Sequence, residues 1–158
     1  MAALIHRAAT LAALLIVGCG LASPKDLISE GHRAIDSGNS TLAQSKFTEA
    51  LKTLKPGDAQ FIEARIGIAE AWIAADAKKA REEFLTLASQ YPNQVEEKDF
   101  AFVGAQMLSA GKYSDAIGVL SASQARFGGA SPELDALIER LKSEEVSTEQ
   151  EHEPLTTL

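Results

Sequence analysis

The sequence predicts an all-α protein, and three observations lead to that prediction. A helical pattern recurs at a nearly constant spacing, with 37 residues from Ala43 to Ala80 and 36 from Ala80 to Ala116. Hydrophobic residues make up 46% of the chain and aromatic residues only 6%, which suits close-packed helices better than a sheet. Within each copy, apolar residues follow a 3.6-residue period. A repeat of this length is typical of stacked helical hairpins, and 158 residues leave room for one such domain.

The first residues of the chain are typical of an export signal. Arg7 precedes the uncharged stretch from Ala8 to Val17, which is shorter than the ~20 residues that span a bilayer. The stretch ends in Ile16-Val17-Gly18-Cys19, which resembles the bacterial lipobox. This resemblance implies a lipoprotein signal peptide over residues 1–18, lipid attachment at Cys19, and an anchor linker over residues 19–24.

The lipobox resemblance also implies a location. A chain processed in this way is anchored by acyl chains in the bacterial cell envelope and faces the periplasm. Gly20 follows the cysteine, where lipoproteins of the inner membrane usually resemble one another in carrying Asp, so the outer membrane is favoured. Two alternatives stay open: an ordinary secretory signal cut after Ala22, which would give a secreted or periplasmic soluble protein, and an uncleaved anchor.

The first predicted hairpin begins at Ser23-Pro24-Lys25-Asp26. Serine suits the N-cap, proline the first turn, and Asp26 stands three residues after Ser23, as in a capping box. The helix is expected to end at Ser37-Gly38-Asn39-Ser40, and a second helix then runs from about Thr41 to Leu54. Pro56-Gly57-Asp58 ends this hairpin.

The second and third hairpins follow the same plan. The second pairs Ile62–Ala74 with Lys78–Gln90, with Asp76 as the N-cap between them. The third pairs Lys98–Ala110 with Ser114–Arg126 and ends at Gly128-Gly129.

A last helix is expected to open at Ser131-Pro132-Glu133 and to run to about Lys142. Its apolar side would cover the exposed end of the array, as terminal helices of repeat proteins do. Residues 143–158 are rich in glutamate and poor in apolar residues, so we expect an acidic, disordered tail there. The helical domain with its capping helix therefore spans residues 25–142.

The hairpins resemble tetratricopeptide repeats. Small residues stand midway along the first helix and between the two helices, a small-large-small pattern marks the second helix, and a proline closes the unit. The matching positions are Gly31 and Gly104, Gly38 and Gly111, Ala43, Phe47 and Ala50, Tyr113, and Pro56 and Pro92. The resemblance implies a right-handed superhelix of three hairpins plus the capping helix. The middle repeat departs from the pattern, because Ile68 stands where the small residue belongs and Gly67 comes one place early.

Several function classes are disfavoured by the sequence. The net charge of −7 argues against nucleic acid as a partner, because that binding depends on Lys and Arg. No catalytic constellation is found, so we expect no enzyme and no cofactor. His32 and Asp36 lie four residues apart on one helix, but two ligands are too few for a metal site.

The resemblance implies that the first helix of each hairpin faces a groove that holds a protein or peptide partner. Carried onto this chain, the candidate groove residues are Lys25, His32, Arg65, Trp72, Ile73, Lys98 and Leu108. Lys25, Arg65 and Lys98 would place three cations in the groove, which would suit an acidic segment or a C-terminal carboxylate. The alternative for Trp72 is that it packs between hairpins.

The expected function is that of a non-enzymatic, membrane-anchored scaffold or adaptor. It resembles the small repeat lipoproteins that assist pilus or secretion machines and outer-membrane assembly. The alternative is a constitutive, pilotin-like subunit of such a machine, with its repeats buried against a larger partner.

Overall fold

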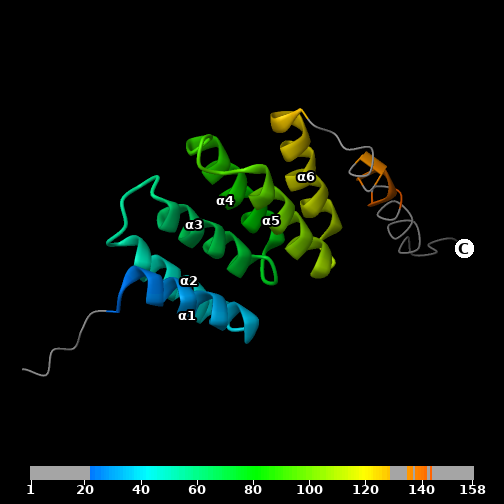
Figure 1. The fold of residues 1–158 in the computed structure, drawn as a ribbon. Coiled ribbons are helices and arrows are strands. Elements are labelled where there is room, and N and C mark those ends of the chain that lie inside the picture. The colour runs from blue at the N-terminus through cyan, green and yellow to red at the C-terminus, as the bar shows by residue number, and fades with distance from the viewer. Residues whose placement is uncertain (1–21, 129–134, 137, 142, 144–158) are drawn as a thin grey trace, which may run out of the picture.

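The protein is all-α in the computed structural model, which describes residues 22–128, 135–136, 138–141 and 143. No strand occurs among these residues. The helices are α1 (Pro24–Asp36), α2 (Ser40–Leu51), α3 (Ala59–Trp72), α4 (Ala77–Gln90), α5 (Glu97–Ser109) and α6 (Tyr113–Phe127). They follow one another from α1 and α2 at one end to α6 at the other, and consecutive pairs form hairpins (Figure 1). The predicted all-α class is confirmed; the handedness of a superhelix stays a prediction.

The helix starts are held by the residues that the sequence singles out. The Ser23 hydroxyl accepts a hydrogen bond from the Asp26 backbone N–H at 3.2 Å, and the Asp76 carboxylate accepts one from Lys79 N at 3.0 Å. Each cap satisfies a backbone donor that has no partner within its own helix. Both predicted N-caps are therefore confirmed.

Two helix bounds differ from the prediction by three residues. The second helix ends at Leu51 rather than Leu54, because Thr53 makes both a backbone and a hydroxyl hydrogen bond to Ala50 O at 3.2 Å and tightens the last turn. The third helix begins at Ala59 rather than Ile62. Asp58, which we expected to end the preceding hairpin, is also the N-cap residue of α3.

Two glycines let the first two hairpins approach closely around one ring. A Cβ added to Gly31 of α1 would lie 2.6 Å from the ring of Phe47 of α2, and a Cβ on Gly67 of α3 would lie 2.4 Å from it. Phe47 is completely buried between them. Gly67 therefore does not serve its own hairpin as Gly31 does, because the side chain that it accommodates is Phe47 of the preceding hairpin.

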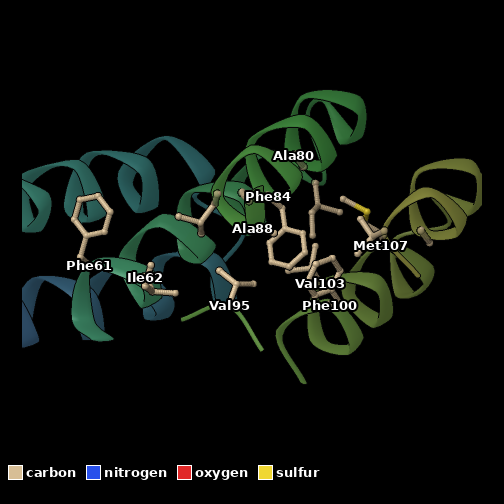
Figure 2. Close-up of a cluster of buried hydrophobic side chains, with 14 residues drawn as sticks. Phe61, Ile62, Ala80, Phe84, Ala88, Val95, Phe100, Val103 and Met107 are labelled. Atoms are coloured by element: carbon tan, nitrogen blue, oxygen red, sulfur yellow. The ribbon is translucent and has the colours of Figure 1, made fainter. Parts of the chain in front are cut away.

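The larger hydrophobic core lies in the second and third hairpins. Figure 2 shows Phe84, Phe100 and Val103 close together, with Phe61 and Ile62 farther along α3. The rings of Phe84 and Phe100 meet edge to face, with centroids 4.9 Å apart, the arrangement that aromatic pairs favour. This cluster joins α3, α4, α5 and α6.

The two junctions between hairpins are built differently. At the junction between the first and second hairpins, α1 and α2 pack against α3. At the junction between the second and third hairpins, the main contact is that of α4 with α6. The close approach of α4 and α6 depends on Gly118, where a Cβ would lie 2.8 Å from Arg81 Cδ. The Arg81 guanidinium reaches Asp115 at 3.0 Å and joins the same two helices.

Beyond Gly128, the residues that are described are helical. Residues 135–136, 138–141 and 143 are helical, and Ile138 and Leu141 are buried. Gln124 of α6 donates a hydrogen bond to the Asp135 carboxylate. These residues belong to the predicted capping helix, whose start at Ser131 lies outside the described residues.

The predicted signal peptide with Cys19 and residues 144–158 of the predicted tail also lie outside the described residues, whereas Ser143, the first residue of that tail, is helical. Among the residues that are described, no helix has both the length and the hydropathy needed to cross a membrane.

Candidate binding groove

Two connected depressions cross the first helices of the three hairpins. The larger, of about 670 Å³, lies over α3 and α5 and reaches α1 at His32; the smaller, of about 350 Å³, lies between α1 and α3. His32 and Glu63 line both depressions, and we refer to the two together as the groove. Its larger part is lined by His32, Ala59, Ile62, Glu63, Ile66, Asn93, Gln94, Glu96, Lys98, Asp99 and Phe102, and its smaller part by Lys25, Ile28, Ser29, His32, Arg33, Asp36, Gln60 and Glu63.

The larger part has an apolar floor. Ile62 is buried and Ile66 half-buried, while Phe102 is 42% exposed. Phe102 lies off the stripe of α5 that carries the buried Phe100 and Val103, so its ring turns away from the core. A concave surface with an apolar floor and a few polar groups is the usual form of a ligand site.

The start of α5 supplies an acidic edge. The Asp99 carboxylate accepts a hydrogen bond from the Glu96 backbone N–H at 2.8 Å and thereby caps the helix. Lys98 Nζ lies 2.7 Å from Glu96 Oε2, and this hydrogen bond raises the pKa of Lys98. The Lys98 charge is therefore matched within the protein, and Asp99 and Glu63 leave the larger part of the groove with an excess of negative charge.

His32 lies between two carboxylates of α3. Its Nε2 is 3.7 Å from Glu63 Oε1, and its Nδ1 is 3.7 Å from Glu70 Oε2. The imidazole also meets the Phe47 ring edge to face, with centroids 5.1 Å apart. His32 thus joins the floor of the groove to the aromatic ring that the first two hairpins share.

Glu70 is a buried carboxylate with incomplete hydrogen bonding. Its side chain is 8% exposed, and Oε2 has no hydrogen-bond partner among the described residues. Burial raises the pKa of Glu70; the nearby His32 opposes this effect, and Asp36 adds to it.

Three of the seven residues predicted for the groove line it. Lys25 lies in the smaller part, Lys98 in the larger, and His32 in both. Three side chains from α1 and α5 that the sequence places on one face are therefore found around the same hollow.

The other four lie elsewhere. Arg65 turns toward α4, where its guanidinium is 3.4 Å from Glu83, and Ile73 is only 5% exposed, within the core. Trp72 is half-buried against the core, and Lys79 Nζ lies 3.6 Å from its ring centroid. This position agrees with the alternative in which Trp72 is a packing residue. Leu108 packs against the same core. These four do not line either part of the groove.

Sequence reasoning missed the carboxylates and the aromatic ring of the larger part. Glu63, Asp99 and Phe102 were not expected there. The one available signal was Phe102, an aromatic residue outside the core stripe of its helix. Within the described part of the chain, no three His, Cys, Asp or Glu side chains are arranged to hold a metal ion.

The fold and the groove define a class: an all-α protein of stacked helical hairpins with a concave surface across their first helices. No protein-family model matches the chain, and the curated proteins contain no significant match to it.

Proposed function

We propose that this protein is a non-enzymatic scaffold that holds a segment of another protein in the groove and is anchored in the bacterial cell envelope through a lipid on Cys19. The observation that carries the proposal is the groove itself, with a half-buried apolar floor, an exposed Phe102 and polar edges. Concave apolar sites with a few polar groups are the usual places where ligands and peptides bind.

The arrangement of the groove suits a chain segment better than a small molecule. Its two parts share His32 and Glu63, and together their linings include residues of α1, α3 and α5. An occupant could therefore contact all three hairpins at once. Segments that lie in such grooves place their side chains at successive anchor points.

The lipid anchor would keep this groove close to the membrane. Pro24, the first residue of α1, stands only five positions after Cys19, so the extended linker would reach about 18 Å at most. Incorporation of a palmitate analogue tests the anchor: wild type should be labelled and Cys19→Ser should not. Absence of label on the wild-type protein would refute this part of the proposal.

Site-specific photocrosslinking tests the groove. A photoreactive phenylalanine analogue replaces Phe102 in the groove or, as a control, Leu42 of α2, which is 43% exposed and outside the groove lining. Irradiation of cells that produce the full chain should yield a protein adduct from position 102 and none from position 42. Adducts only from position 42, or from neither, would contradict the proposed groove.

A constitutive subunit of a pilus, secretion or outer-membrane assembly machine is the second candidate. Leu42 and Tyr113, both more than 40% exposed and outside the groove lining, favour it, because a permanent partner could cover them. In that case both positions 42 and 102 would yield adducts, and the protein would elute from size exclusion only with its complex.

A further inference from the structure

The charge of the groove identifies the kind of segment that it would hold. Resting on the proposed function, we infer that the larger part of the groove takes a basic segment, in which a large apolar side chain stands next to lysine or arginine. This reverses the expectation of an acidic partner. That expectation depended on three cations that the fold separates.

None of the three cations leaves a free positive charge in the larger part. Arg65 faces Glu83 at 3.4 Å and does not line the groove. Lys98 is held by Glu96 at 2.7 Å. Lys25 lies in the smaller part, whose lining contains two basic residues and two carboxylates.

Negative charge prevails around the apolar floor. The larger part is lined by the carboxylates of Glu63, Glu96 and Asp99 against the single ammonium of Lys98. Glu63 is 54% exposed, and among the described residues its basic neighbour is His32, at a distance of 3.7 Å. An acidic occupant would meet three carboxylates and one ammonium, an excess of two negative charges, whereas a cationic one would be attracted during encounter and held at the edge.

The apolar floor explains why charge alone would not suffice. Ile62, Ile66 and Phe102 form an apolar surface that would stay exposed to water if the occupant were only a compact hydrophilic cation. A side chain such as Phe or Leu would cover it, and burial of apolar area contributes roughly 25 cal/mol per Å². The carboxylates then fix the neighbouring cation, so apolar and basic groups must occur together in the ligand.

Fluorescence anisotropy with synthetic nonapeptides tests the inference. The probes carry a central Phe flanked by two Lys, by two Glu or by two Ser, and a fourth has Ser between two Lys. The full chain is held in phosphatidylcholine nanodiscs, and empty nanodiscs correct for binding to lipid. The Phe–Lys probe should bind at least tenfold more tightly than the Phe–Glu and Ser–Lys probes.

Two variants of equal charge distinguish the groove from general attraction to an acidic protein. Glu63→Gln should weaken the Phe–Lys probe about two- to fivefold, as expected for an exposed ion pair worth up to about 1 kcal/mol. Glu82→Gln on α4, 60% exposed and outside the groove lining, should leave binding unchanged. Phe102→Ala should weaken every probe that contains Phe.

The outcomes separate this inference from the proposed function. Equal or tighter binding of the Phe–Glu probe, equal effects of Glu63→Gln and Glu82→Gln, or no binding of the Phe–Lys probe at 1 mM would each overturn the basic-segment inference. The proposed groove itself would stand as long as position 102 yields a protein adduct in cells.

Discussion

The packing of Phe47 against Gly67 makes a sharp prediction about Gly67→Ala. Alanine is normally the better helix residue, by ~1 kcal/mol over glycine. Here the new Cβ would lie 2.4 Å from Phe47 Cζ, far inside van der Waals contact. The ring is fully buried, and Gly31 of α1 also lies close against its Cε1 and Cζ atoms, so the ring has little space into which it could move.

Overpacking of a closed core costs about 1–3 kcal/mol, and an approach of 2.4 Å places this case in the upper range, about 2–3 kcal/mol, which exceeds the ~1 kcal/mol gain in helix propensity. We therefore expect Gly67→Ala to lower the free energy of unfolding by about 1–2 kcal/mol. For a domain of this size the midpoint of thermal unfolding should fall by about 5–10 °C. Urea denaturation followed by circular dichroism measures the effect, with an unchanged m value showing that the cooperativity is retained.

A double-mutant cycle assigns the cost to the ring. Phe47→Leu removes the atoms that Gly67→Ala would strike, so in that background the alanine should be neutral or stabilising. In the comparison variant Gly118→Ala the new Cβ would lie 2.8 Å from Cδ of Arg81, a flexible and partly exposed side chain that can shift, so stability should change by less than ~1 kcal/mol. An equal cost of Gly67→Ala with and without Phe47 would refute the reasoning.

Two further predictions concern Arg126 and Glu70. Arg126→Ala should lower the free energy of unfolding, measured by urea denaturation, by about 2–3 kcal/mol. The reason is that the guanidinium donates hydrogen bonds to Ala88 O at 3.1 Å, to Val95 O at 3.3 Å and to Pro92 O. A loss below ~0.5 kcal/mol would contradict this prediction. Burial raises the pKa of Glu70 in the folded state, so folding favours the protonated carboxyl. The stability of the wild type relative to Glu70→Gln should therefore rise as pH falls from neutral toward 4.5, the ordinary pKa of a glutamate. Urea denaturation across this pH range measures the difference between the two proteins, and a difference independent of pH would count against the raised pKa.

The sequence predicted the helices well because the relevant signals are local. Apolar periodicity and caps such as Ser23 and Asp76 act within one helical turn, and the structure confirms both caps. The start of α3 was placed three residues late because Asp58 was interpreted only as the end of a hairpin. Local signals therefore show that an element begins or ends nearby, but one residue can mark the end of one element and the start of the next.

The groove was harder to predict because its charge depends on contacts between helices. Arg65 was expected among the groove cations, yet Glu83 of α4 lies 3.4 Å from it and draws it to the other side of α3. Gly67 was aligned with its own hairpin, although its partner is Phe47 of the preceding one. Repeat spacing shows which positions correspond, but not which side chains meet across a junction.

The position of Arg126 has a consequence for the order in which the molecule is completed during synthesis. The carbonyl of Ala88 lies in the last turn of α4 and those of Pro92 and Val95 lie between α4 and α5, but the donor that binds them stands near the end of α6. While the ribosome is still making α5, these carbonyls have no guanidinium to bind. The array therefore cannot finish one hairpin after another, and its middle reaches its final form only when the last residues of α6 have emerged.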